Sequence, residues 1–178
     1  RGELISNFLN HQGEPERYLR QVEKKAATYN GFCLLLYGSQ GLHYLSNFDS
    51  EGFRTLGSGL YGLSNHLLDT PWPKVEEGKQ AVGEWLKTDS EDVEGLFAIM
   101  ARKDWAADED LPDTGVDRAF EKSLSALFIE SPSYGTRSTS VVLVGYDGAT
   151  VFVERTFEPH TGKESTVRFE LELTVGNQ

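Results

Sequence analysis

The sequence predicts an α+β fold in which antiparallel hairpins flank a block of helices. Apolar residues recur at helical spacing in the middle of the chain and alternate with polar residues in the last third. Two hairpin signals, one in the first third and one in the last, are the other main observation. Hairpin strands pair locally and the helices gather in one block, so we expect a layered architecture with mostly antiparallel sheet.

One helix and one hairpin are expected in the first third of the chain. A proline follows Glu14, where a helix can begin, and apolar residues then share one helical face, which predicts a helix over about 14–28. The apolar run 32–37, the turn cluster 38–41 and the segment 42–46 predict a hairpin. Because the run 32–37 is apolar throughout, we expect its strand to be buried on both faces.

Three helices are expected in the middle block. Prolines at 71 and 73 precede a helical pattern over 75–86. Asp89 precedes a denser pattern over 93–100, whose acidic first turn complements the helix dipole. An acidic loop, 104–117, then leads to a third helix. Its inner face is expected to carry Phe120, Leu124, Leu127 and Phe128.

The last third reads as three strands. The segments 140–146 and 150–157 flank Asp147-Gly148, one of the stronger short-range hairpin signals. Strict alternation over 167–175 predicts a strand with one buried face and one solvated face. No linker or internal repeat divides the 178 residues, so we expect a single domain over 1–178.

The charge balance excludes several classes of partner. With 17 basic and 28 acidic residues, the net charge is −11, which repels nucleic acid and anionic membranes alike. No apolar run is long enough to cross a bilayer, so no membrane insertion is expected. A single cysteine, Cys33, rules out an internal disulfide and a multi-cysteine metal cage. We therefore expect a soluble protein of a reducing compartment, the cytoplasm.

Short motifs in the chain carry little chemistry by themselves. The segment 57–62 matches G-x-G-x-x-G, but a dinucleotide site needs a helix to continue from the third glycine, and two prolines follow instead. Ser64, His66 and Asp69 are the residue types of a catalytic triad without its sharp serine turn. None of the four histidines forms a zinc pattern. His66 alone, in a loop beside a Pro-Trp-Pro corner, is a candidate ligand-binding residue.

A series of segments, in this order, resembles one known family. The most specific are Gly-Leu-Ser-Asn at 62–65 with Asp-Thr-Pro-Trp-Pro-Lys at 69–74, and Tyr-Gly-Thr-Arg at 134–137. Supporting segments are Arg-Gly-Glu-Leu at 1–4, Tyr-Asn-Gly-Phe at 29–32, Leu-Pro-Asp at 111–113 and Glu-Arg at 154–155. Together they resemble the NRDE family, also called the transport and Golgi organisation protein 2 family, over essentially the whole chain.

The resemblance implies the fold of the N-terminal-nucleophile hydrolases, a four-layer αββα sandwich. Family members begin with a Met-Cys pair followed by the Asn-Arg-Asp-Glu motif, and these residues are absent here. We therefore expect the chain to be the larger, C-terminal part of one NRDE-family domain, lacking its N-terminal strands.

The resemblance also implies a non-enzymatic haem-trafficking protein, or haem chaperone. Haem would be its cargo and haem-acceptor proteins its partners, with no other cofactor expected. A carrier needs apolar walls, a single or weak axial ligand and a cation for the propionates. By residue type, His66 is the candidate iron ligand and Arg137 or Lys74 the cation. Tyr61 and Trp72, with Phe32 and Leu63, are the candidate walls.

An N-terminal-cysteine amidohydrolase is the alternative. Its nucleophile would lie in the missing segment, because the terminal residue of such enzymes supplies both the nucleophile and the general base. By similarity of placement, Asn65 would be the oxyanion donor and Arg137 a supporting cation. Enzyme activity thus stays open, with the non-enzymatic carrier favoured. The family name further suggests a role in secretory-pathway organisation, and in a eukaryote a mitochondrial or secretory-pathway association would fit.

Overall fold

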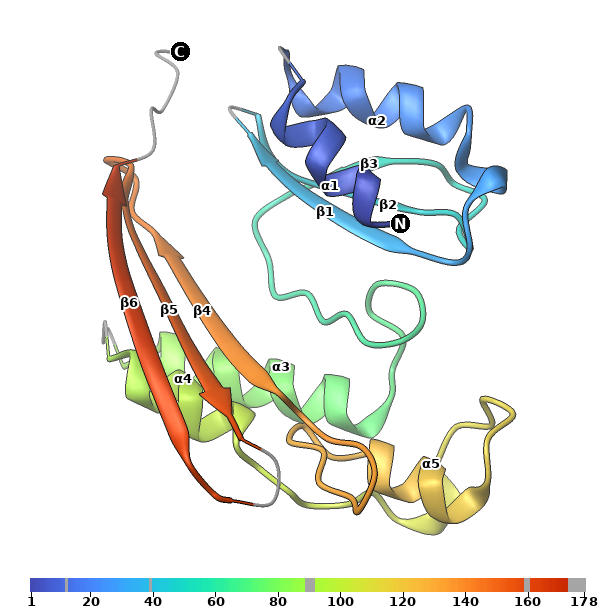
Figure 1. Cartoon of the computed structure of the whole chain (residues 1–178), viewed down its shortest axis with the longest axis vertical. Coiled ribbons are helices and arrows are strands. Elements are labelled where there is room, and N and C mark those ends of the chain that lie inside the picture. Colours follow the sequence, from blue (N-terminus) through green and yellow to red (C-terminus); the bar gives the residue numbers. More distant parts are fainter. Residues whose placement is uncertain (12, 39, 89–91, 159–160, 173–178) are drawn as a thin grey trace. The chain divides into compact units, whose positions relative to one another are not determined.

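The computed structural model describes residues 1–11, 13–38, 40–88, 92–158 and 161–172. The chain divides into two compact units, unit 1 over Arg1–Leu68 and unit 2 over Asp69–Gln178, and each is described by itself (Figure 1). Each unit contains one three-stranded antiparallel sheet and its own helices, so the predicted α+β class is confirmed. The expectation of a single domain remains a prediction.

Unit 1 contains two helices and the first sheet. Its elements are α1 (Gly2–Leu9), α2 (Pro15–Glu23), a 3-10 turn (Ala26–Thr28), β1 (Cys33–Gly38), β2 (Gly41–Ser46) and β3 (Arg54–Leu56). The strands lie in the order β1-β2-β3, and Leu34 of β1 pairs with Leu45 of β2. The predicted hairpin is therefore confirmed, whereas α1 and β3 were not expected from the sequence.

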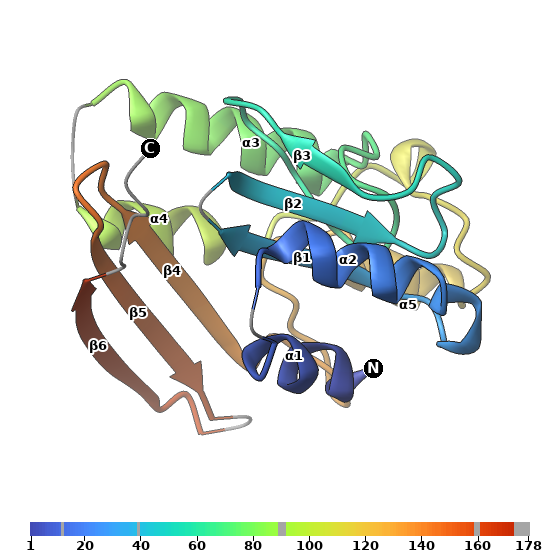
Figure 2. The same cartoon turned by 90° about the horizontal axis from the view of Figure 1, so that it is seen from above.

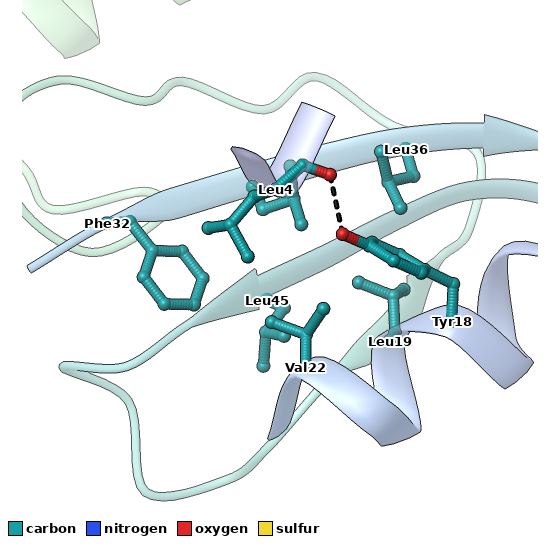
Figure 3. Close-up of a cluster of buried hydrophobic side chains, with 8 residues drawn as sticks. Leu4, Tyr18, Leu19, Val22, Phe32, Leu36 and Leu45 are labelled. Atoms are coloured by element: carbon teal, nitrogen blue, oxygen red, sulfur yellow. Dashed lines mark hydrogen bonds between the residues drawn. The ribbon is translucent and has the colours of Figure 1, made fainter. Parts of the chain in front are cut away.

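The core of unit 1 lies between its sheet and its two helices, which cover the same face of the sheet (Figures 1 and 2). Leu19 of α2 and Leu45 of β2 are almost completely buried there. The Tyr18 hydroxyl donates to the carbonyl of Leu4 at 2.6 Å, which joins α1 to α2 inside this core (Figure 3). Burial of each large apolar side chain stabilises the fold by about 1.5–3 kcal/mol.

Two expectations for unit 1 were wrong in detail. The first long helix ends at Glu23 rather than near 28, because backbone bonds tighten to i→i+3 spacing from Lys25 N to Val22 O and from Thr28 N to Lys25 O. Strand β1 is buried on one face only, since Leu35 is 41% and Tyr37 54% exposed. Their side chains alternate with those of Leu34 and Leu36, which face the core.

Unit 2 contains three helices and the second sheet. Its elements are α3 (Pro73–Leu86), α4 (Val93–Met100), a 3-10 turn (Asp108–Asp110), α5 (Arg118–Leu124), β4 (Ser138–Val144), β5 (Ala149–Phe157) and β6 (Glu164–Glu172). The strands lie in the order β4-β5-β6. The expected helices 75–86 and 93–100 and the second hairpin are confirmed. Asp92 caps α4 by accepting from Glu94 N at 3.0 Å, while Asp89 lies outside the described residues.

The core of unit 2 is built where α4 packs on the sheet, around Phe97, Val141 and Val153. Arg155 of β5 contacts this core through the ring of Phe97. The Arg155 guanidinium lies 4.3 Å from the centre of the Phe97 ring and binds both carboxylate oxygens of Glu94, at 2.7 and 3.0 Å. The ring contact and the hydrogen bonds from one guanidinium nitrogen to both oxygens of Glu94 attach β5 to α4.

Two expectations for unit 2 also need correction. Helix α5 ends at Leu124, so Leu127 and Phe128 lie beyond it instead of on its inner face. Every residue of β6 is exposed, including Phe169 at 53%, although one buried face was expected. The register explains this: Phe169 pairs with Phe152, on the sheet face opposite to that of Val153, which packs against α4. Residues 173–175 of the expected strand lie outside the described residues.

Candidate functional site

The predicted site residues are divided between the two units. Tyr61, Asn65 and His66 belong to unit 1, whereas Trp72, Lys74 and Arg137 belong to unit 2. The structure therefore gives the surroundings of each group separately.

In unit 1, the predicted residues share one irregular segment, 57–68, between β3 and the end of the unit. Its backbone is attached to the sheet: the Cys33 thiol donates to the carbonyl of His66 at 3.4 Å, and Leu68 N donates to the Tyr44 hydroxyl at 3.2 Å. Burial, and next a hydrogen bond with Cys33, raise the pKa of Tyr44 above its ordinary value. The segment carrying Asn65 and His66 is thus fixed through its main chain.

The glycine motif at 57–62 lies in the same segment. The Tyr61 hydroxyl donates to the carbonyl of Gly57 at 3.2 Å, a hydrogen bond within the glycine segment. Residues 57–72 are all described and contain no helix, and the next helix, α3, begins at Pro73, so the motif lacks the helix N-terminus that would face a pyrophosphate. The helix that a dinucleotide site would need after these glycines does not follow them in the structure.

In unit 2, Trp72 and Lys74 lie at the start of α3. The Lys74 ammonium donates to the carbonyl of Leu124 at 2.8 Å, at the C-terminal end of α5, and lies 5.7 Å from the centre of the Trp72 ring. Burial lowers the pKa of Lys74, an effect that Glu121 partly offsets. This lysine has a structural partner in its own unit, and its predicted contact with haem propionates remains a prediction.

Arg137 lines a pocket of unit 2 with a volume of about 990 Å³. The pocket is formed by the segment 128–137, by Ala101 and Lys103 just after α4, and by residues 157–158 and 162–164 of β5, of β6 and of the chain between them. The whole Tyr-Gly-Thr-Arg block, one of the two most specific family segments, is part of its lining. Ligand pockets commonly measure about 300–1,000 Å³, so this one is large enough for an extended ligand.

The walls of the pocket are partly aromatic. The rings of Phe128 and Phe157 meet edge to face with centres 4.8 Å apart. The Lys103 ammonium lies 5.3 Å from the centre of the Phe128 ring and forms an ion pair with Glu130 at 2.7 Å. Aromatic side chains with a cation at their margin suit a flat, apolar ligand that carries negative charge at its edge.

A short backbone ladder holds the segment 129–136 in place. Thr136 N donates to the carbonyl of Ile129 at 2.8 Å, and Ile129 N donates to the Thr136 hydroxyl at 3.0 Å. At the tip, Ser131 N donates to the carbonyl of Tyr134 at 2.9 Å. Gly135 faces this ladder so closely that a Cβ atom there would lie 2.9 Å from the Ile129 carbonyl oxygen. The glycine of the family block is therefore required by close backbone approach.

The charges of the pocket are unevenly paired. Its lining carries three cations, Lys103, Arg137 and Lys163, and three carboxylates, Glu130, Glu158 and Glu164. Lys103 is paired with Glu130, and Glu158 accepts from the Thr161 hydroxyl at 2.8 Å. Within the described ranges, the side chains of Arg137 and Lys163 have neither an ion pair nor a hydrogen bond. Two cations of the lining are thus available for an anionic ligand, beside two carboxylates, Glu158 and Glu164, that have no ion pair in the described ranges.

Sequence reasoning identified Arg137 but missed the other parts of the pocket. Lys103 lies just after α4, and Lys163 lies in the β5–β6 connection, 26 positions after Arg137. Only the pairing of β4 with β5 and β5 with β6 brings these segments to one place. The one available signal was Gly162-Lys163, a glycine turn followed by a cation between two strands.

No group of three or more metal-ligating side chains occurs in the described part of the chain. The same residues include no helix that could span a membrane.

Comparison with known proteins places the chain in a family. The family model described as Transport and Golgi organisation 2 matches residues 1–159. A bovine Transport and Golgi organization protein 2 homolog is 32% identical over 192 residues, covering 97% of this chain and 68% of that protein. Its human counterpart is 32% identical, covering 87% and 61%, and a Drosophila melanogaster Transport and Golgi organization protein 2 is 35% identical, covering 90% and 63%. The chain thus spans about two thirds of the length of these relatives, and it belongs to the Transport and Golgi organisation 2 family, the NRDE family.

Proposed function

We propose that this chain binds haem in the pocket of unit 2 and serves as a haem carrier that passes its cargo to acceptor proteins. The observation that carries the proposal is the coincidence of Arg137 with the pocket: the cation expected for the propionates lines an aromatic-walled cavity of about 990 Å³. Haem is flat and apolar over its macrocycle and has two carboxylates at one edge. The rings of Phe128 and Phe157 suit the macrocycle, and Arg137 and Lys163 suit the carboxylates.

The two unpaired cations support this assignment. A guanidinium binds a carboxylate in bidentate fashion and an ammonium binds it as a point charge, so Arg137 and Lys163 could each hold one propionate. Hydrogen bonds to charged groups stabilise a complex by about 1.5–3 kcal/mol each. The chain carries a net charge of −11, so local cations are needed to hold a dianionic ligand against the overall repulsion.

The aromatic wall supports binding of the macrocycle. Phe128 and Phe157 contribute apolar area, and their edge-to-face contact keeps both rings in place before a ligand arrives. Tyr134 of the lining is 53% exposed, which suits a cargo that must leave again.

We also propose that the two sheets form the inner layers of the αββα sandwich of the N-terminal-nucleophile hydrolases. Support comes from each unit by itself. In unit 1 the helices cover one sheet face while Leu35 and Tyr37 are exposed on the other. In unit 2, α4 covers one face while Val142 and Phe169 are exposed on the other. Apolar side chains on the uncovered faces are what the inner layers of such a sandwich require.

A titration of the full 178-residue chain with haem, followed in the Soret band, tests the function. We expect saturable one-to-one binding that weakens about tenfold or more in Arg137→Gln and in Lys163→Gln, because each loses a charged hydrogen bond. Lys87→Gln is the matched control, since Lys87 pairs with Glu84 in unit 2 and does not line the pocket.

The outcome of this titration distinguishes the haem carrier from the amidohydrolase, and the unit 2 pocket from His66 as the haem site. Absence of saturable binding would contradict the carrier and return attention to the amidohydrolase alternative, with Asn65 as its oxyanion donor. Binding that Arg137→Gln and Lys163→Gln leave intact but His66→Ala abolishes would keep the carrier and remove the unit 2 pocket as its site.

A further inference from the structure

The described lining of the unit 2 pocket includes one phenol, that of Tyr134. Resting on the proposed function, we infer that the side-chain oxygen of Tyr134 is the axial ligand of ferric haem, in place of the imidazole of His66. Which residue binds the iron is a separate question from whether the chain binds haem at all.

Tyr134 is held firmly and yet its hydroxyl is unused. Its backbone carbonyl accepts from Ser131 N at 2.9 Å and from the Ser131 hydroxyl at 2.7 Å, and its own N–H donates to that hydroxyl oxygen at 3.1 Å. Its ring meets Phe120 edge to face with centres 5.8 Å apart. In the described ranges, the Tyr134 hydroxyl has no hydrogen-bond partner. Tyr134 is 53% exposed, so its hydroxyl is accessible both to solvent and to a ligand in the pocket.

Tyr134 is also the described lining residue whose side-chain type binds haem iron in proteins. Proteins hold haem iron through histidine, cysteine, methionine or tyrosine. Among the described residues that line the pocket there is no histidine, cysteine or methionine, and Tyr134 is the single tyrosine. The lysines lack a free lone pair while protonated, and Lys103 is already paired with Glu130.

The chemistry of binding balances without a further reagent. Ferric haem in water carries a water ligand. When Tyr134 binds, that water leaves the iron, the phenol oxygen forms the new bond to iron, and the phenol proton passes to solvent. The iron remains ferric throughout, and its positive charge stabilises the anionic oxygen. The propionates, at the edge of the macrocycle, remain free to bind Arg137 and Lys163.

The experiment is a ferric haem titration of the wild-type chain, Tyr134→Phe, Tyr134→His and Tyr146→Phe, followed by absorption and resonance Raman spectroscopy. Tyr134→Phe removes only an unpaired hydroxyl and keeps the ring on Phe120, so the fold should be retained; unchanged circular dichroism and thermal midpoint verify this. Tyr146 lies outside the pocket lining and is fully exposed between β4 and β5, which makes Tyr146→Phe the matched control.

We expect a phenolate-to-iron charge-transfer band and phenolate Raman modes in the wild type and in Tyr146→Phe, and neither in Tyr134→Phe. Removal of even a partner of a metal ligand costs about 10–100-fold in metal affinity, so Tyr134→Phe should bind at least about tenfold more weakly. Tyr134→His should restore binding with the spectrum of histidine-ligated haem. The swap of spectral type distinguishes ligation from a merely structural role.

Two results would overturn the inference while leaving the carrier in place. One is a Tyr134→Phe variant with wild-type affinity and spectrum. The other is loss of the axial-ligand signature in His66→Ala or in His160→Ala, the latter a residue outside the described ranges. If the wild-type chain fails to bind haem saturably, the proposed function itself fails, which is a different and recognisable outcome.

Discussion

Gly135→Ala tests whether the backbone ladder of the pocket is as tight as the structure shows. The new methyl carbon would lie 2.9 Å from the carbonyl oxygen of Ile129, closer than such atoms pack in proteins. That oxygen cannot swing aside, because it belongs to the main chain and accepts the Thr136 N–H at 2.8 Å. The strain must therefore move the segment 129–136 as a whole.

The magnitude follows from two contributions. Overpacking of a closely packed site costs about 1–3 kcal/mol. Relief of the clash also stretches the Thr136–Ile129 hydrogen bond, and such a bond contributes about 0.5–1.5 kcal/mol net. We expect the free energy of unfolding of unit 2 to fall by about 2 kcal/mol, close to a 30-fold change in the folding equilibrium constant.

Urea unfolding followed by tryptophan fluorescence measures this loss selectively. All three tryptophans, Trp72, Trp85 and Trp105, belong to unit 2 and report on that unit. Gly78→Ala is the matched control: it lies inside α3, where its Cβ would meet only the end of the Leu127 side chain at 3.4 Å. Alanine is favoured over glycine in a helix by about 1 kcal/mol, so this variant should gain stability. A Gly135→Ala variant within about 0.5 kcal/mol of wild type would refute the reasoning.

Two further predictions concern one hydrogen bond in each unit. Tyr18→Phe leaves the carbonyl of Leu4 without its buried donor and should cost about 1–2 kcal/mol in urea unfolding followed by circular dichroism, whereas Tyr37→Phe, at a 54% exposed position, should cost almost nothing. Equal costs for the two variants would contradict the core described for unit 1. Lys74, whose pKa burial lowers from the ordinary 10.5, begins to lose its proton in the folded state at a pH where the unfolded chain still holds it. The stability of the wild type relative to Lys74→Met should therefore rise as the pH approaches 10.5, and a difference that is independent of pH over that window would contradict the burial of this ammonium.

Local patterns predicted most of the secondary structure because the relevant forces are local. The turn signal at 147–148 and the helical spacing over 93–100 each place an element correctly. Helix α1 was missed because its apolar residues pack only once Tyr18 and the sheet are present. Strand β3 is three residues long and has too little sequence for a period to show.

Burial was predicted less well than secondary structure. The alternation over 167–175 predicted one wet and one buried face for β6, but period 2 does not reveal which face meets a helix. In the structure Arg168 shares the face of Val153, and Phe169 faces the other way. Only the cross-strand register, which depends on the loop lengths of both hairpins, settles the question.

The site was predicted in part for a similar reason. Arg137 belongs to a family segment and lines the pocket, whereas Lys103 and Lys163 lie outside the family segments. Residue type also suggested Lys74 as a cation for the ligand, and in the structure its ammonium donates to the carbonyl of Leu124. The availability of a charge depends on its three-dimensional neighbours, which a linear pattern does not contain.

Hydrogen exchange measured by mass spectrometry, with and without saturating ferric haem, tests most directly whether haem binds in the pocket of unit 2. We expect slower exchange in the segment 128–137 and in the lining residues 157–158 and 162–164, with the segment 57–68 unchanged. Protection confined to 57–68, or no protection anywhere at saturation, would contradict the assignment of this pocket as the haem site.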